Sequence, residues 1–269
     1  TKDYDIHLLF INNVLGKSQI ELLEKNNITY KILKTRKKSA HNPGALTNIY
    51  TAIYCYYFAY RYKINKITFT HWGLNSDFLT LPIFLLRKQI ILFVHSEPYT
   101  PNRFKFIWKL LTKFFSKLIS NHKLITVSNY NKMMIEKNWL DKSTDVKVIY
   151  NFSNIELKRS EEKDRHITIL TLGHVRDYKN PELWLEVARK ITSKNRTVKF
   201  VWAGEGELLK DFQDKTKKNK NINFIGYKKD VTNLYKSSDI YLQLSKIETQ
   251  GIAVIDAMKY RIPCIVSNK

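Results

Sequence analysis

Short apolar runs separated by stretches of helical periodicity recur along the whole of this 269-residue chain. This alternation is typical of parallel β-α-β units. The strands predicted in the first half are Ile6–Ile11, Ile28–Leu33, Ile67–Thr70, Gln89–Val94, Leu124–Val127 and Val146–Tyr150. Those predicted in the second half are Ile167–Leu172, Val198–Ala203, Ile222–Ile225, Ile240–Leu244 and Cys264–Val266.

A polar, charged passage without clear periodicity separates the two series of strands, and we interpret it as an interdomain connection at residues 151–165. The predicted fold class is therefore α/β, with one Rossmann-like domain at residues 1–150 and a second at residues 166–269, facing each other across a cleft. Ligands of open α/β sheets bind beyond the carboxyl ends of the strands, so candidate functional residues are sought there.

The stretch 245–258 contains two carboxylates, Glu248 and Asp256, eight positions apart. Apolar spacing becomes helical from about Gly251, and eight residues make a little over two helical turns, so the two acids can share one side of a pocket. The N-terminus of this helix would offer free N–H groups to an anionic ligand. The alternative is that Glu248 caps the helix and Asp256 is a solvated helix residue.

Potential cations follow two predicted strands. His95 ends the strand 89–94, and His174, Arg176 and Lys179 lie in the loop after the strand 167–172. Three cations beside one strand end make a candidate clamp for a diphosphate. Alternatively, they are ordinary surface residues of a basic protein, and His95 is a packing or hydrogen-bonding histidine.

Two strand-to-helix turns of the second half contain glycine. After the basic loop, Asn180 is a natural N-cap residue and Pro181 suits the first helical position. The turn 203–206 reads Ala-Gly-Glu-Gly and lacks the G-x-G-x-x-G spacing, so a dinucleotide fingerprint is absent.

Composition adds a strong positive charge. The formal net charge is +22, and 43% of the residues are hydrophobic, enough for two buried cores. Such an excess favours an anionic partner or surface. Cys55 and Cys264 match no metal or redox spacing, which indicates a reducing cytosol. No signal peptide or bilayer-spanning run is visible, and we expect the sequence to be a fragment at both ends.

A predicted helix at 102–123 concentrates this charge. Lys105, Lys109, Lys113 and Lys117 recur every four residues on one side, and Trp108 belongs to a broad apolar and aromatic face opposite. This pattern suits an anionic membrane surface. The alternative is a core-packed helix with a solvated outer face. Nucleic-acid binding is disfavoured, because no recognised nucleic-acid motif is present.

Taken together, these motifs resemble those of the family 4 glycosyltransferases, which have the GT-B fold. The resemblance runs from about Tyr4 to Lys269 and is strongest after Ile167. It rests on a glycine–lysine turn, a G-x-G turn, a glycine strand end, an aspartate-led strand and an E-x7-E-like motif. These are Leu172–Lys179, Val201–Gly206, Phe224–Tyr227, Asp239–Leu244 and Ser245–Asp256, with Val127-Ser128 and Ile149–Asn151 before the hinge.

The resemblance implies a retaining, metal-independent transfer of a sugar from a UDP- or GDP-sugar to an envelope glycan or lipid-linked saccharide, as in polysaccharide or lipopolysaccharide biosynthesis. It implies a cytoplasmic protein, peripheral on the inner face of the membrane. Lys179 would bind the diphosphate, Glu248 and His95 would act at the sugar, and Asp256 would bind the ribose. The other implied donor-binding residues are Gly173, His174, Arg176, Gly204, Tyr227 near the base, Gly251 and Ile252.

This sequence departs from the family pattern at several positions. His174 and Asp256 replace the usual Arg and Glu, Thr249-Gln250 replaces Gly-Phe, and Arg261 stands where a helix-ending Gly is usual. These departures leave open a catalytically idle GT-B relative that acts as a membrane-associated binding protein. Another GT-B chemistry, such as epimerisation or hydrolysis of a nucleotide sugar, is a further alternative.

Overall fold

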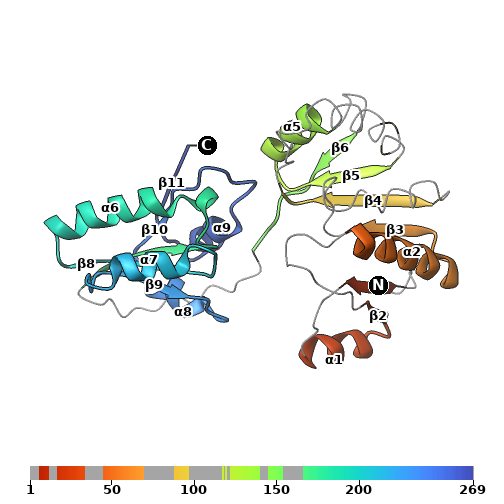
Figure 1. Ribbon diagram of the computed structural model, residues 1–269, viewed down its shortest axis with the longest axis horizontal. Helices are drawn as coiled ribbons and strands as arrows, with labels where there is room; N and C mark the ends of the chain where they lie inside the picture. The colour runs from red at the N-terminus through yellow and green to blue at the C-terminus, as the bar shows by residue number, and fades with distance from the viewer. Residues whose placement is uncertain are drawn as a thin grey trace. The chain divides into compact units, whose positions relative to one another are not determined.

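A computed structural model describes residues 6–11, 17–33, 45–69, 88–96, 117, 119, 122–139, 145–153 and 166–268. The chain divides into two compact units, residues 1–149 and residues 150–269 (Figure 1). Of the predicted connection at 151–165, only residues 151–153 are described.

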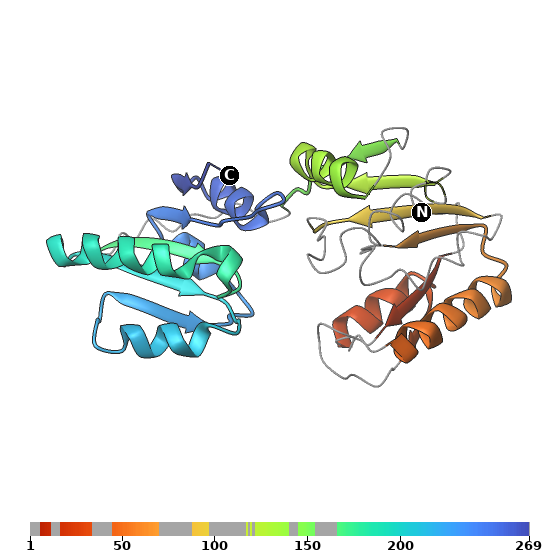
Figure 2. The same cartoon turned by 45° about the horizontal axis from the view of Figure 1, so that its top comes forward.

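The first unit is built from parallel strands. β1 (His7–Ile11) pairs with β2 (Thr29–Leu33), and a second sheet has the order β3-β4-β5-β6 (Figure 2). The strands of that sheet are β3 (Lys66–Phe69), β4 (Gln89–Val94), β5 (Lys123–Thr126) and β6 (Val146–Val148). Among its described residues, the helices are α1 (Lys17–Lys25), α2 (Ala45–Arg61) and α5 (Asn129–Asn138). Alternate apolar residues of β4 form the centre of its core, because they lie on one face of the sheet.

The second unit contains a five-stranded parallel sheet in the order β11-β10-β7-β8-β9. Its strands are β7 (Ile167–Leu172), β8 (Val198–Ala203), β9 (Ile222–Gly226), β10 (Ile240–Gln243) and β11 (Cys264–Val266). Its helices are η3 (Asp177–Lys179), α6 (Pro181–Lys194), α7 (Leu209–Thr216), α8 (Thr232–Lys236) and α9 (Ile252–Lys259).

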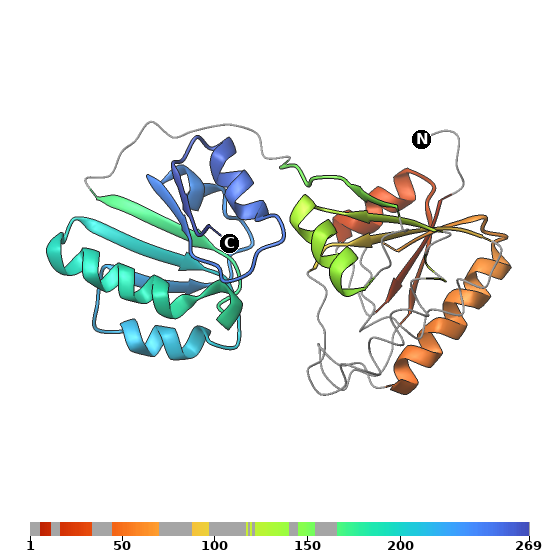
Figure 3. The ribbon, with the colours of Figure 1, turned by 90° about the horizontal axis from the view of Figure 1, so that it is seen from above.

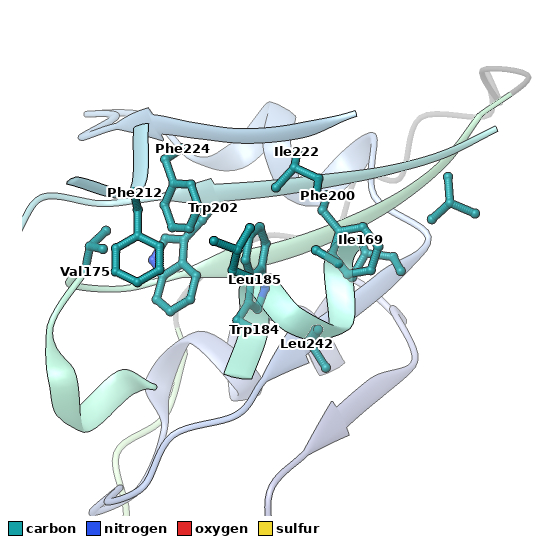
Figure 4. Packing of buried hydrophobic residues seen from close by; sticks show 12 residues of the cluster. Ile169, Val175, Trp184, Leu185, Phe200, Trp202, Phe212, Ile222, Phe224 and Leu242 are labelled. Atoms are coloured by element: carbon teal, nitrogen blue, oxygen red, sulfur yellow. The ribbon is translucent and has the colours of Figure 1, made fainter. Parts of the chain in front are cut away.

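Helices cover both faces of this sheet, α6 and α7 on one side and α9 on the other (Figure 3). On the face covered by α6 and α7, the aromatic rings of Trp184, Trp202 and Phe224 pack together with centroids 5.0–5.5 Å apart (Figure 4). On the opposite face, Tyr235 and Tyr260 stack with centroids 5.1 Å apart. Because both faces are buried, the strands read as nearly continuous apolar runs, as expected for a parallel sheet.

The predicted strands are confirmed in type and order, and four of them match to the residue. Asn180 is the N-cap residue of α6 and Pro181 begins the helix, as predicted, although the Asn180 backbone is left-handed (φ 58°) and its side chain makes no capping hydrogen bond. One local prediction was wrong. Lys123 begins β5, so the predicted helix 102–123 extends too far.

At the end of α9, Arg261 takes a left-handed backbone (φ 57°), where the family pattern has glycine. Its N–H donates to the Met258 carbonyl, and the Ile262 N–H donates to the Ala257 carbonyl. This is the helix-ending geometry that glycine adopts without a Cβ penalty. Arginine therefore keeps the shape of the turn at some cost in backbone strain.

Candidate active site

The strand order of the second unit locates a binding edge. From β7 the chain proceeds through β8 to β9 on one side, then crosses over to β10 and β11 on the other. The switch point therefore lies between β7 and β10. Ligands of open α/β sheets bind beyond the carboxyl ends of the strands at such a point. The loops that leave β7 and β10 there contain Lys179 and Glu248, respectively.

The loop after β7 is held against the loop after β8. The Trp202 indole N–H donates to the Gly173 carbonyl over 2.9 Å, and the Gly173 N–H donates to the Ala203 carbonyl over 3.1 Å. A Cβ on Gly204, where φ is +153°, would lie 2.0 Å from the Gly173 oxygen. Glycine at 204 is therefore required by close backbone packing, which fixes the starting point of the basic loop.

The Lys179 ammonium and the Glu248 carboxylate form an ion pair and hydrogen bond through Oε2 of Glu248. The side chains are 15% and 27% exposed, so the pair is largely removed from water. The Gln243 amide Nε2 donates to the same carboxylate oxygen over 2.8 Å. One lysine and one glutamate from two loops, 69 residues apart in sequence, thus meet at the switch point.

The start of α9 lies beside this pair. Gly251 is its N-cap residue with a left-handed backbone (φ 72°), and Ile252 begins the helix with 51% of its surface exposed. A Cβ on Gly251 would lie 3.5 Å from Cγ of Glu248. The first N–H groups of α9 have no acceptors within the helix, and they are candidate donors to an anionic ligand.

Asp256 lies in the middle of α9. Burial raises the pKa of the Tyr241 hydroxyl, and the Glu248 and Asp256 carboxylates raise it further. That the two acids share one side of a pocket stays a prediction.

The remaining basic residues of the loop hold its shape. His174 Nδ1 lies 3.3 Å from the Glu205 carbonyl oxygen, and Arg176 Nε lies 4.0 Å from the Glu207 carboxylate. Burial raises the pKa of the adjacent Tyr178 hydroxyl, and Arg176 opposes this shift. Lys179 therefore has the direct contact with Glu248, whereas His174 and Arg176 contact the loop after β8.

Two other predicted residues each follow a strand. Tyr227 follows β9 and is 64% exposed. His95 follows β4 in the first unit, with its ring 6.2 Å from that of Phe93. Four residues predicted to contact a membrane, Lys105, Trp108, Lys109 and Lys113, lie outside the described residues. Of the same stretch, Lys117 is exposed, and Ile119 is buried in the core of the first unit.

Sequence reasoning missed Gln243, Tyr241 and Gln250. Gln243 is a buried polar residue at the end of an otherwise apolar strand, and this was the available signal. The Gln250 amide pairs with both backbone groups of Asn151, over 2.8 and 2.9 Å. Nothing in the sequence pattern linked those two residues, because they are 99 positions apart.

Within the described ranges, no group of three or more His, Cys, Asp or Glu side chains could hold a metal ion. Nor is any described helix both long enough and apolar enough to cross a membrane.

Comparisons with known proteins agree with this architecture. Residues 153–269 match the family model of glycosyl transferases group 1. Anabaena Alr3699/HepE, solved in complex with UDP-glucose, aligns with 98% of this chain and 80% of its own at a TM-score of 0.72 and 13% identity. The fold is the GT-B fold. A Rickettsia africae glycosyltransferase of the same fold aligns with 98% of this chain and 79% of its own, at a TM-score of 0.66 and 15% identity.

Curated relatives of this GT-B chain are also glycosyltransferases. The Escherichia coli UDP-Gal:alpha-D-GlcNAc-diphosphoundecaprenol alpha-1,3-galactosyltransferase is 28% identical over 182 residues, which are 61% of this chain and 46% of that protein. An uncharacterized glycosyltransferase of Haemophilus influenzae is 28% identical over 195 residues, 71% of this chain and 54% of that protein. The chain thus spans about half the length of these relatives.

Proposed function

We propose that the protein containing this chain is a family 4 glycosyltransferase that moves a sugar from a UDP-sugar to a lipid-linked or other glycan acceptor, with retention of anomeric configuration and without a metal. The observation that carries this proposal is the Lys179–Glu248 pair at the switch point of the sheet. UDP is favoured over GDP because the Escherichia coli relative uses UDP-Gal and the Anabaena structure contains UDP-glucose.

The reaction requires stabilisation of two charges. As the bond between the sugar carbon and the diphosphate breaks, negative charge grows on the diphosphate and positive charge grows on the sugar ring. In the proposed complex, Lys179 and the N-terminus of α9 face the diphosphate, and Glu248 faces the sugar. The acceptor oxygen then bonds to the sugar carbon on the face that the diphosphate leaves, and its proton goes to an oxygen of the departing diphosphate, so the configuration is retained.

The test is release of UDP from a panel of UDP- and GDP-sugars by the full-length protein, with a diphospholipid-linked saccharide as acceptor. We expect turnover with at least one UDP-sugar and its loss in Glu248→Gln. Absence of both nucleotide binding and turnover would refute the proposal. Nucleotide binding without turnover would support the catalytically idle relative, and turnover that is unchanged in Glu248→Ala would show that Glu248 takes no part in the reaction.

We further propose that the lysine stripe of residues 102–123 brings the protein to the cytoplasmic face of an anionic membrane. Support comes from the sequence pattern and from the lipid-linked substrate of the Escherichia coli relative. Each lysine near such a surface contributes about 1 kcal/mol. Replacing Lys105, Lys109 and Lys113 with Glu should therefore weaken binding to anionic vesicles by roughly a hundredfold.

Matched controls for this vesicle test are Glu replacements at Lys190, Lys194 and Lys210, which change the net charge equally in the second unit. Equal binding by both triple variants would contradict a membrane role for the stripe.

A further inference from the structure

Gln243 is a buried polar residue between two hydrogen-bonding groups. It ends β10 and is 5% exposed. Its Oε1 lies 3.1 Å from the Tyr241 hydroxyl, and its Nε2 lies 2.8 Å from Oε2 of Glu248. A glutamine amide has one accepting end and one donating end, so the two contacts use both.

The orientation of this amide is determined by its neighbours. The Tyr241 oxygen already accepts the Leu172 N–H over 3.3 Å, and its own proton can go to Gln243 Oε1 or to the Leu172 carbonyl. A reversed amide would place Oε1 against the Glu248 carboxylate, where two acceptors repel. The carboxylate therefore selects the orientation in which Gln243 donates to it.

The surroundings hold the bond in place. Tyr241 is fully buried, and it bonds to Leu172, the last residue of β7 before the basic loop. Above the bond, a Cβ on Gly251 would lie 3.4 Å from Nε2 of Gln243. The amide is thus fixed from below by the sheet and covered by the turn before α9.

We propose that Gln243 is a positioning residue that holds the Glu248 carboxylate in place when Lys179 turns to the donor diphosphate. This inference rests on the proposed function. Glu248 accepts from Lys179 and Gln243 together. Once the ammonium pairs with phosphate, Gln243 remains as a rigid donor to the carboxylate. Without it, the three side-chain torsions of Glu248 become free to rotate.

Misplacement of a reacting group by about 1 Å can cost roughly a hundredfold in rate. In the full-length protein, we expect Gln243→Met to lower kcat by about ten- to a hundredfold. The Kd for UDP should stay within about twofold, because UDP lacks the sugar that Glu248 faces. Gln243→Glu should lower kcat further, because a second carboxylate would face the first and repel it.

Gln213→Met is the matched control. Gln213 lies on α7, and its side-chain amide donates a hydrogen bond to the Phe224 carbonyl over 2.9 Å. This bond lies beside β9, and α7 covers the face of the sheet opposite to α9 (Figure 3). Gln213→Met should lose stability without a change in kcat. Tyr241→Phe, which removes only the hydroxyl behind Gln243, should give a smaller fall in kcat and provides a second variant if Gln243→Met does not fold.

The outcomes separate the two proposals. The positioning role alone is overturned if the wild type is active and if kcat in both Gln243→Met and Tyr241→Phe stays within twofold of the wild-type value. It is also overturned if Gln213→Met loses as much kcat as Gln243→Met when the two variants lose the same stability. A wild type that neither binds UDP nor turns over any donor overturns the proposed function and, with it, this inference.

Discussion

The Lys179–Glu248 pair allows a prediction in which stability and ligand binding change in different ways. An exposed ion pair contributes about 0.2–1 kcal/mol, whereas breaking a fully buried pair costs about 3–5 kcal/mol. With side chains 15% and 27% exposed, this pair lies between these limits. We expect Lys179→Met and Glu248→Gln each to lower the free energy of unfolding by about 1–2 kcal/mol.

The double variant should lose about as much as either single variant, because the first substitution already removes the interaction. The coupling energy of the cycle is therefore expected at about 1 kcal/mol or more. Urea unfolding of the four proteins measures it. The Gln243 hydrogen bond to Glu248 lessens the loss in Lys179→Met, since the carboxylate retains one donor.

Binding of UDP should separate the two single variants. Loss of a hydrogen bond between charged groups costs about 1.5–3 kcal/mol, so Lys179→Met should weaken UDP binding by at least about tenfold. Glu248→Gln should leave the affinity equal or higher, because Lys179 no longer has to leave a carboxylate to meet the diphosphate. Isothermal titration measures both constants.

Two results would refute this reasoning. One is a coupling energy near zero, which would mean that the pair has no energetic role in the folded protein. The other is an equal loss of UDP affinity in Glu248→Gln and Lys179→Met, which would place Glu248 at the nucleotide and not at the sugar.

Three further predictions concern the frame of the site. Gly204→Ala should lower the unfolding free energy by more than about 2 kcal/mol, because its Cβ would collide with the Gly173 carbonyl. The control is Gly226→Ala, whose Cβ meets only Leu209 at 3.9 Å and which should cost about 1–2 kcal/mol of backbone strain. Thermal unfolding compares the two variants. Burial raises the pKa of the Tyr235 and Tyr241 hydroxyls above the ordinary value of 10.0, so the unfolded chain loses these protons at a lower pH than the folded protein. Their contribution to the free energy of unfolding is complete below pH 10 and falls above it by up to about 1.4 kcal/mol per pH unit for each tyrosine. Tyr241→Phe should therefore flatten the dependence of the urea midpoint on pH. Gln250→Ala removes two hydrogen bonds to the backbone of Asn151, so the hydrogen of the Asn151 backbone amide should exchange with solvent about 10- to 100-fold faster. An unchanged exchange rate would show that these bonds do not hold the backbone of Asn151 in place.

Sequence pattern predicted the sheet well because the inner strands of the second unit, β7, β8 and β10, are largely buried on both faces. Runs such as Ile167–Leu172 and Val198–Ala203 have few other ways to bury their side chains, and both match the observed strands to the residue. The end of a helix is less determined. Asn180 has the residue type of an N-cap, but the 3-10 turn η3 leads directly into α6 and leaves Asn180 in a left-handed conformation, which prevents the usual capping contact.

The site shows the same division. Lys179 and Glu248 could be predicted, because each follows a strand at the edge where parallel sheets bind ligands. Their mutual contact and the amide of Gln243 could not, since these depend on which strands are neighbours. Only the order β10-β7 places the two loops side by side, and a periodicity argument gives strands without their order.

The Lys179–Glu248 ion pair explains how a protein with so much positive charge can still select its ligand. A free, exposed lysine attracts any anion, but the Lys179 ammonium is largely buried against Glu248, so an incoming phosphate must replace that partner. A lone phosphate would leave the Glu248 carboxylate without its cation. A nucleotide sugar offers charge to Lys179 and hydroxyl donors to Glu248 at the same time, and it therefore compensates both groups. On the proposed function, the pair favours the complete donor over its fragments, and Gln243 keeps the carboxylate in position while the partners exchange.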